Sequence, residues 1–405
     1  MIENIKKKKI ISVITLIVLF QESLIYLVPF NTINLLSIIG LFLFLVNGKN
    51  IFKRHYEFKT LVLSFILIQL FGIILSNIYY GQGIFQGIYG AHYIFIYGWY
   101  FYLVDLMRIN CSKPYNEYAE YTKNYLVKLG LIIVSVVILQ GVLYDKVVFL
   151  NLKYALRNGL RISGCYIATP IFIFLLADIF KKFNLKRLIA ICIVSYYLIK
   201  FNQSRSLIIV LLISMIILYL RNLITKNFKF GIKDLFIIYI GIIILIATYK
   251  YWSSMIGEML NEMSSVKNTG GVRIREMQYY YELLKERHFL GIGILAYEFP
   301  LTEIIHGTAQ YYYYLEDVGM FSMLFQTGIL GVIWLIAFLV KFFRVIRAHK
   351  KDYWSFVGYI NLYRIIFGFL TIQIFNNKYS LVYFIIILAM MEIKVNKKID
   401  LHKKG

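Results

Sequence analysis

The chain has 405 residues, of which 60% are hydrophobic and 16% are charged, and its mean hydropathy is +0.68. A soluble globular domain is nearer half apolar and a quarter charged, so a water-soluble fold is excluded. The apolar residues are enough for about twelve membrane spans of about 20 residues each, which leaves little room for a soluble catalytic domain of about 100 residues. The net charge of +23 is explained by the positive-inside rule of membrane proteins, so we expect no nucleic-acid partner.

Apolar runs bounded by charged residues predict an all-α, polytopic integral membrane protein, with the whole chain, 1–405, as a single membrane domain. The first span follows four consecutive lysines, Lys6–Lys9, and no small-residue cleavage site follows it, so we interpret it as an uncleaved span. In chain order the predicted spans are 10–29, 32–47, 60–77, 88–105, 125–144, 165–180, 187–200, 206–221, 235–251, 318–340, 354–374 and 379–394.

A cytoplasmic N-terminus places most of the lysines and arginines in cytoplasmic segments, as the positive-inside rule requires, and makes both termini cytoplasmic. The largest outer segment is then the 66-residue loop 252–317, between the ninth and tenth spans. Residues 273–290 of this loop lack Pro and Gly and space apolar residues at helical intervals, which predicts an amphipathic helix near the surface. Gly270-Gly271 is expected to precede this helix and Gly291-Ile292-Gly293 to end it.

The arginines follow the positive-inside rule less closely than the lysines do. An arginine fork holds phosphate oxygens by two parallel charge-assisted hydrogen bonds, so arginines gathered on the outer face suggest a phosphate-bearing ligand. The alternative is that each arginine reaches separately to lipid headgroups; that alternative predicts dispersed arginines, whereas a binding site predicts convergence. Six of the 13 arginines lie in predicted outer segments: Arg157, Arg161, Arg205, Arg273, Arg275 and Arg287.

Other polar residues could supply acid–base chemistry. His306 lies in the long loop and is a candidate general base, although an isolated histidine is more often structural. Glu316 and Asp317 close the loop, where a carboxylate could accept a hydroxyl proton or cap the next helix. Glu22 lies within the first span, where an acid is costly and is expected to be functional or paired, with Arg364 as a conceivable partner.

Several chemistries have no matching pattern. Cys111, Cys165 and Cys192 are too widely spaced to suggest a disulfide framework or a zinc site. The chain has no Gly-rich phosphate loop, no His-Glu-x-x-His pair and no Gly-x-Ser-x-Gly elbow, which disfavours ATP hydrolysis, metalloproteolysis and serine hydrolysis. We therefore expect neither a metal nor a cofactor.

Several segments of the chain form a recognisable series. Arg273–Tyr281 begins with arginines and is followed by His288–Gly293, which ends in Gly-x-Gly within the large outer loop. Glu316–Gly319 and Phe325–Gly331 then lead into the next span, and Arg161–Pro170 and Gln203–Ser206 form two weaker patterns upstream. Together these segments resemble the Wzy-type family of bacterial polysaccharide (O-antigen or capsule repeat-unit) polymerases, which is related to the O-antigen ligases and has an arginine-led helix ending in Gly-x-Gly within its large outer loop.

The resemblance implies a glycosyltransferase at the outer face of the bacterial cytoplasmic membrane. Such enzymes transfer a growing glycan from undecaprenyl pyrophosphate to a hydroxyl of an incoming lipid-linked repeat unit, and a flippase and a chain-length regulator are their expected partners. His306 would be the base, narrowly ahead of Glu316 and Asp317. Binding of the pyrophosphate leaving group is assigned first to Arg161, Arg205 and Arg275, and then to Arg273 and Arg157.

Two other functions fit parts of the pattern. An O-antigen ligase would have a His-Asn pair after the Gly-x-Gly, whereas here His306 is followed by Gly307, which favours a polymerase. Twelve spans with Glu22 and Arg364 in the membrane would also suit a lipid-linked oligosaccharide flippase or transporter. Transporters of that kind usually contain two related halves, and this sequence has no such repeat.

Overall fold

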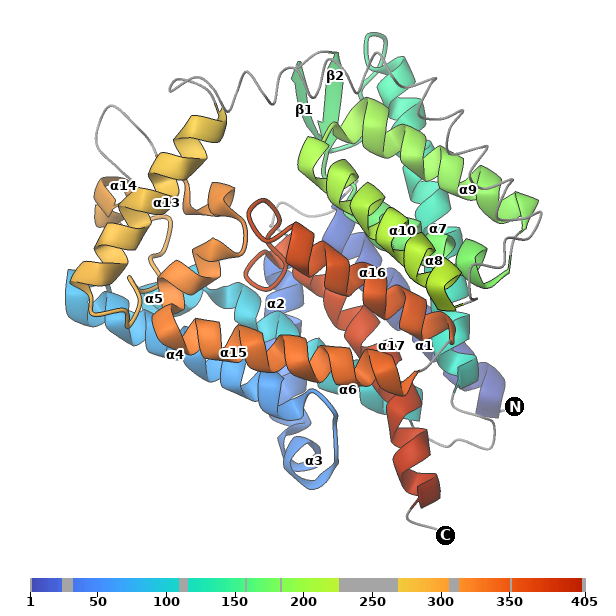
Figure 1. Ribbon diagram of the computed structural model, residues 1–405, viewed down its shortest axis with the longest axis horizontal. Coiled ribbons are helices and arrows are strands. Elements are labelled where there is room, and N and C mark those ends of the chain that lie inside the picture. Colours follow the sequence, from blue (N-terminus) through green and yellow to red (C-terminus); the bar gives the residue numbers. More distant parts are fainter. Residues whose placement is uncertain are drawn as a thin grey trace.

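The computed structural model describes residues 2–23, 32–108, 116–156, 159–182, 184–225, 269–305, 313–349 and 352–402. These residues form a bundle of helices with one two-stranded hairpin (Figure 1), so the predicted all-α class is confirmed. The elements are α1 (Ile2–Glu22), α2 (Thr32–Val46), α3 (Gly48–Lys53), α4 (Lys59–Tyr80), α5 (Ile84–Gly90), η1 (His92–Tyr97), α6 (Gly98–Arg108), α7 (Asn116–Leu143), β1 (Lys153–Leu156), β2 (Leu160–Ser163), α8 (Ala168–Lys181), α9 (Leu185–Tyr196), η2 (Tyr197–Asn202), α10 (Arg205–Thr225), α13 (Thr269–Glu286), α14 (Leu301–Ile305), η3 (Leu315–Val318), α15 (Phe321–Ala348), α16 (Tyr353–Phe367) and α17 (Lys378–His402).

A helix overlaps each predicted span that falls within the described ranges, whereas the predicted ninth span, 235–251, lies outside them. Within these ranges three helices are long and apolar enough to cross a membrane: Lys59–Tyr80, Glu117–Leu143 and Phe321–Ala348. Thr32–Val46 and Ser206–Arg221 are shorter apolar helices. The chain thus has the apolar helices of a membrane protein.

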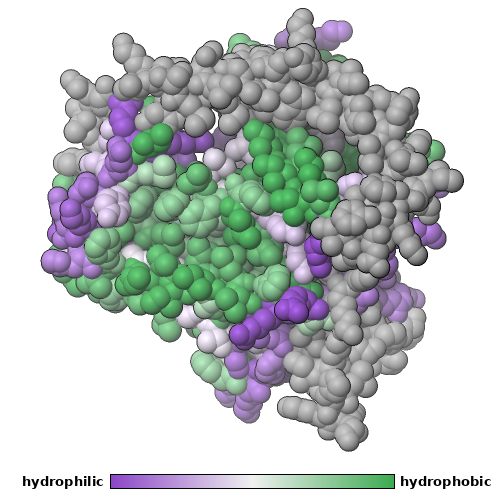
Figure 2. All heavy atoms as spheres, in the orientation of Figure 1, coloured by the Kyte–Doolittle hydropathy of each residue, from purple (hydrophilic) through white to green (hydrophobic). Residues whose placement is uncertain are grey.

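The surface of α15 carries a stripe of exposed apolar side chains. Ile329, Ile333 and Ile336 are 49%, 57% and 57% exposed and follow one another at helical spacing. Figure 2 shows hydrophobic side chains over the middle of this face of the molecule and hydrophilic side chains at its left edge and at its bottom. An apolar surface of this extent marks contact with lipid or protein rather than with water.

The fourth predicted span, 88–105, was expected to be one continuous helix, and that expectation is wrong. The chain forms α5, the 3-10 helix η1 and α6 in its place. A Cβ atom at Gly90 would lie 2.7 Å from the Cα atom of Ala296, and one at Gly98 would lie 2.0 Å from the backbone oxygen of Gly40. The break therefore occurs where two glycines let other segments approach the backbone closely.

The two ends of the bundle differ in their polar contacts. The first turns of α1 and the last turns of α17 lie at the same end (Figure 1), which we call the basal end. Ion pairs gather there, between Arg54 and Asp105 at 2.9 Å and between Arg108 and Glu392 at 3.0 Å. The opposite, apical end holds the last turn of α1, the β1–β2 hairpin and α13.

Candidate functional site

A β-hairpin carries the first of the predicted phosphate-binding arginines. Strands β1 and β2 pair in antiparallel fashion, with Ala155 opposite Arg161. Arg161 lies in strand β2. Arg157 itself lies outside the described residues.

Arg161 faces a turn from a distant part of the chain. Its Nε donates a hydrogen bond to the backbone oxygen of Asn202 at 3.1 Å, and the Gln203 side chain donates back to the Leu160 oxygen at 3.3 Å. Gln203 adopts a left-handed backbone conformation (φ 52°), which ends the π-helical segment η2 and allows α10 to begin at Arg205. The Arg161 side chain thus lies beside the turn that leads into Arg205, whose side chain lies outside the described part of the structure. We call this region the Arg161 corner.

A buried carboxylate fixes the segment that follows β2. Glu22 is 3% exposed and accepts hydrogen bonds from the amides of Tyr166 and Ile167, each at 2.9 Å, and from the Tyr383 hydroxyl. It therefore satisfies free N–H groups at the start of α8, where a negative charge is favourable. The ion pairs between described residues do not include the pair expected between Glu22 and Arg364. Arg364 is also buried, and within the described ranges its Nε has no hydrogen-bond partner.

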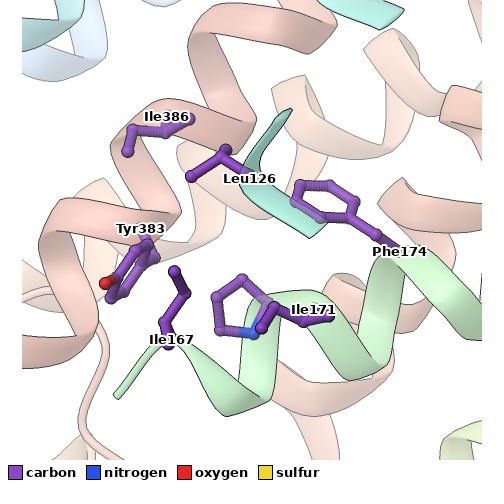
Figure 3. Close-up of a pocket in the computed structure, with 7 residues that line it drawn as sticks. Leu126, Ile167, Ile171, Phe174, Tyr383 and Ile386 are labelled. Carbon is purple, nitrogen blue, oxygen red and sulfur yellow. The ribbon is translucent and has the colours of Figure 1, made fainter. Parts of the chain in front are cut away.

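Two cavities lie near these helices. The first is internal, has a volume of about 10 Å³ and is enclosed by apolar side chains of α7, α8 and α17 (Figure 3). Because one water molecule needs about that much space, no sugar or phosphate fits there. The second is an open groove of about 550 Å³ between α7 and α9. Its lining residues are Ser135, Ile138, Leu188, Ile189, Cys192, Ile193 and Tyr196.

The groove between α7 and α9 leads toward the Arg161 corner. Helix α9 ends at Tyr196, which lines the groove, and η2 continues directly from it to Asn202, the residue that accepts the hydrogen bond from Arg161. From Leu188 to Tyr196 the groove follows α9 for about 12 Å, at about 1.5 Å per residue. The groove therefore ends at Tyr196, six residues along the chain before the partner of Arg161.

The second group of predicted residues lies on α13. The expected helix at 273–290 is confirmed, but it begins and ends four residues earlier, at Thr269 and Glu286. Glycines are tolerated in its first turn because the N–H groups there have no partner within the helix. The helix ends where His288 and Phe289 take positive φ angles of 51° and 60°.

Glu276 lies on the inner face of α13 and was not among the predicted site residues. It is fully buried, and its Oε1 accepts a hydrogen bond from the amide of Tyr314 at 3.1 Å. Its Oε2 is buried without a hydrogen-bond partner in the described part of the chain, as is the Nε of Arg273 one helical turn earlier. Burial raises the pKa of Glu276, the Tyr314 amide lowers it, nearby Asp317 raises it and Arg273 lowers it.

Aromatic side chains surround this acid. The Tyr280 hydroxyl donates to the Tyr313 oxygen at 2.9 Å. The rings of Tyr279 and Tyr313 lie 5.2 Å apart, and those of Tyr280 and Phe325 lie 5.7 Å apart. These contacts hold α13 against the segment 313–318 and the start of α15. We call Arg273, Glu276, Tyr280, Tyr314 and Asp317 the α13 site.

The Gly-x-Gly segment fixes the position of α13 in the bundle. The amides of Ile292 and Gly293 donate to the oxygens of Phe325 and Gln326 at 2.9 and 3.1 Å. Gly291 has φ 118°, and a Cβ atom there would lie 2.5 Å from the Gln326 oxygen. The segment therefore lies directly against the backbone of α15, beside the kink in that helix at Gly328.

Gln82 holds the next residues of the same segment. Its Nε2 donates to the Ile294 oxygen at 3.0 Å, and its Oε1 accepts from the Ala296 amide at 2.7 Å. Gln82 is buried and satisfies two backbone groups that would otherwise lie unpaired between helices. No sequence pattern pointed to it, because its partners lie more than 200 residues further along the chain.

The predicted site residues thus fall into two places. Arg161 and the backbone of Arg205 belong to the Arg161 corner, where β2 packs on η2. Arg273 and Arg275 lie on α13, which packs on η3 and α15, and Asp317 is exposed on η3. His306 and the Glu316 side chain are outside the described residues. Figure 1 shows the hairpin and α13 in different parts of the apical end.

Within the described ranges, no three His, Cys, Asp or Glu side chains come together as a metal site would require. No protein-family model matches the chain, and no curated protein matches it. Its function has to be inferred from the residues and their geometry.

Proposed function

We propose that this protein is a membrane glycosyltransferase that polymerises undecaprenyl-pyrophosphate-linked oligosaccharide repeat units. The reaction would take place at the outer face of the bacterial cytoplasmic membrane and would release undecaprenyl pyrophosphate. The convergence of Arg161 on the turn before Arg205 is the observation that carries this proposal. The two arginines lie 44 residues apart in the sequence, yet the Arg161 side chain contacts the backbone segment that leads into Arg205, whereas arginines that reached separately to lipid headgroups would be dispersed.

The proposed topology has twelve spans and two cytoplasmic termini. It is supported by the helices that overlap the predicted spans and by the position of the first turns of α1 and the last turns of α17 at the basal end. Ion pairs at that end also agree with a cytoplasmic location, because Lys and Arg concentrate on the cytoplasmic side of membrane proteins. The apical end, with the Arg161 corner and the α13 site, would then face outward.

The arginines would bind the pyrophosphate groups of the lipid-linked substrates. Fixed guanidinium groups stabilise the charge that develops on a leaving phosphate without reorganising during the reaction. We assign this role to Arg161 and Arg205 in the corner and to Arg275 and Arg273 on α13, with Arg157 as a further candidate. Two groups of arginines suit a reaction in which both the donor and the acceptor carry a pyrophosphate.

The apolar groove supports a lipid-linked substrate. A polyprenyl pyrophosphate combines a long apolar tail with an anionic head, and the groove between α7 and α9 leads toward the Arg161 corner in that same order. At about 12 Å the groove spans less than half of a bilayer core of about 30 Å. It would therefore hold the part of the tail nearest the pyrophosphate and leave the rest in the lipid.

Deleting the gene and analysing the lipid-linked glycans would test the proposal. Loss of long polymer with accumulation of one repeat unit on the outer face of the membrane is the expected result. Accumulation on the inner face would identify a flippase instead, and unchanged polymer would refute the polymerase. The flippase that supplies the repeat unit and the regulator that limits chain length would be separate proteins.

A further inference from the structure

We propose that Glu276 is the general base of the proposed reaction and accepts the proton of the acceptor sugar's hydroxyl at the α13 site. This assignment rests on the proposed glycosyltransferase function, and it replaces His306, Glu316 and Asp317 in that role. Its basis is the arrangement of Glu276 and Arg273 on one face of α13 against the segment 313–318.

The two oxygens of Glu276 have different environments. Oε1 accepts the hydrogen bond of the Tyr314 amide, which fixes the orientation of the carboxylate. Oε2 is buried and has no partner among the described residues, and an unsatisfied buried acceptor costs about 1–3 kcal/mol. A substrate hydroxyl is a donor of the kind that Oε2 lacks, so binding the acceptor would complete the hydrogen bonding of this carboxylate.

Arg273 adds a second unsatisfied group beside the first. It precedes Glu276 by one helical turn, so both side chains lie on the same face of α13. Its Nε is also buried without a partner in the described chain. A donor and an acceptor that are both unsatisfied and both turned to one face form a site suited to a polar ligand, because sugar hydroxyls donate and accept hydrogen bonds.

The charged and titratable groups around Glu276 also suit a base. Arg273 on α13 favours the ionised form of Glu276 and Asp317 on η3 disfavours it, while the ring of Tyr280 lies tilted at 5.7 Å from that of Phe325 on α15. Burial is the largest influence, and it raises the pKa of Glu276. A carboxylate with a raised pKa takes a proton from a hydroxyl more readily than one with an ordinary pKa does.

Other acids near the site fit this role less well. Asp317 is exposed to solvent. Glu282, on the opposite face of α13, is 65% exposed and lies 3.9 Å from Lys285. Glu276, in contrast, is shielded from bulk water and held in one orientation by the Tyr314 amide.

In the proposed step the hydroxyl oxygen of the acceptor attacks the anomeric carbon of the donor glycan while Glu276 removes the hydroxyl proton. The new bond forms between that oxygen and the anomeric carbon. The bond from the anomeric carbon to the pyrophosphate oxygen breaks, and its electron pair leaves with undecaprenyl pyrophosphate, whose charge the arginines balance. Glu276 then returns the proton to water.

Glu276→Gln separates a catalytic role from a structural one. The amide oxygen of glutamine can still accept the Tyr314 hydrogen bond and the side chain has nearly the same volume, but an amide cannot accept the hydroxyl proton. We expect Glu276→Gln to lower the rate of polymerisation by about 100-fold or more. Glu282→Gln, the matched change on the exposed face of the same helix, should polymerise at the wild-type rate.

The assay uses the full-length protein in membranes and follows the growth of glycan chains on lipid-linked repeat units. The amount of each variant in the membrane is measured by immunoblot. A Glu276→Gln variant that is present at the wild-type level and polymerises at more than about one third of the wild-type rate would overturn the assignment. If Glu276→Gln fails to accumulate in the membrane, Glu276→Asp tests the assignment of Glu276 as the base instead. Since Asp keeps a carboxylate in a different position, it should move the acid limb of the pH profile, and an unmoved limb overturns the proposal.

Failure of this assignment can be told apart from failure of the proposed function. Wild type, Arg161→Ala and Glu276→Gln are assayed in parallel. If wild-type protein makes no polymer, the glycosyltransferase proposal fails. If wild type makes polymer and Glu276→Gln does so equally, only the assignment of the base fails.

Discussion

The Nε atom of Arg161 donates a 3.1 Å hydrogen bond to the backbone oxygen of Asn202. This hydrogen bond joins the hairpin between α7 and α8 to the last residue of η2, and the Gln203 side chain adds a second one to the Leu160 oxygen. Because Nε is used for this contact, the guanidinium group is held in one orientation by the protein itself. A group fixed in this way stabilises a developing charge without first losing conformational entropy.

Replacing the arginines is therefore expected to abolish long polymer without preventing membrane insertion. Arg161→Ala, Arg205→Ala and Arg275→Ala should each accumulate single repeat units, as measured by glycan electrophoresis. Lysine should restore only part of the activity, because it lacks the planar fork. Arg344→Ala is the control, since Arg344 is exposed near the basal end of α15. Normal ladders of chain length in all three variants would contradict the pyrophosphate assignment.

The spans could be predicted from sequence because each is a continuous run of apolar residues, and such a run is recognised from neighbouring residues alone. The break between α5 and α6 could not, since it depends on contacts of Gly90 with Ala296 and of Gly98 with Gly40, which are distant in sequence. Glu276 was missed for a similar reason. The helical spacing of apolar residues in α13 also marks a second face, where Ile274 and Tyr281 are 48% and 49% exposed, so the spacing did not show which face is buried. The burial of Glu276 depends on the segment around Tyr314.

Glu22 is expected to anchor the segment that carries Arg161. Glu22→Ala would leave the amides of Tyr166 and Ile167 unpaired in a buried place, at a cost of about 1–3 kcal/mol for each group. Glu22→Gln keeps one acceptor oxygen and should lower the stability of the protein less than Glu22→Ala does. Thermal unfolding of the detergent-solubilised protein, followed by intrinsic fluorescence, measures the difference. Equal midpoints for wild type and Glu22→Ala would show that the anchor is not needed for stability.

A substitution in the Gly-x-Gly segment tests how closely this segment packs against α4. At Gly293 φ is 84°, and a Cβ atom would lie 2.4 Å from the Oγ of Ser76. Gly293→Ala should therefore destabilise the protein by about 1–3 kcal/mol and disturb the position of α13. Gly48→Ala is the matched control, because a Cβ atom there meets nothing within 4 Å. Protease sensitivity of membranes containing each variant should rise for Gly293→Ala and not for Gly48→Ala. The same sensitivity for both variants would contradict the close approach of this segment to α4.

The groove between α7 and α9 is expected to hold the lipid tail next to the pyrophosphate. Ile189, which is 54% exposed and lines the groove, can be replaced by Trp to fill it. Ile189→Trp should raise the KM for the lipid-linked substrate more than it lowers kcat, because the groove binds a part of the substrate that does not react. Ile336→Trp, at a residue 57% exposed on α15, should change neither value.

Cys192 offers an independent measurement of the same groove. Its thiol is exposed and lines the groove, whereas Cys165 is buried. In a variant with Cys111 replaced by Ser, a membrane-permeable maleimide should label Cys192, and undecaprenyl pyrophosphate should slow the labelling because the tail covers the thiol. Undecaprenol, which lacks the pyrophosphate, should protect less, since the Arg161 corner would not hold it. If Cys192 is labelled at the same rate without lipid, with undecaprenyl pyrophosphate and with undecaprenol, the lipid tail lies elsewhere.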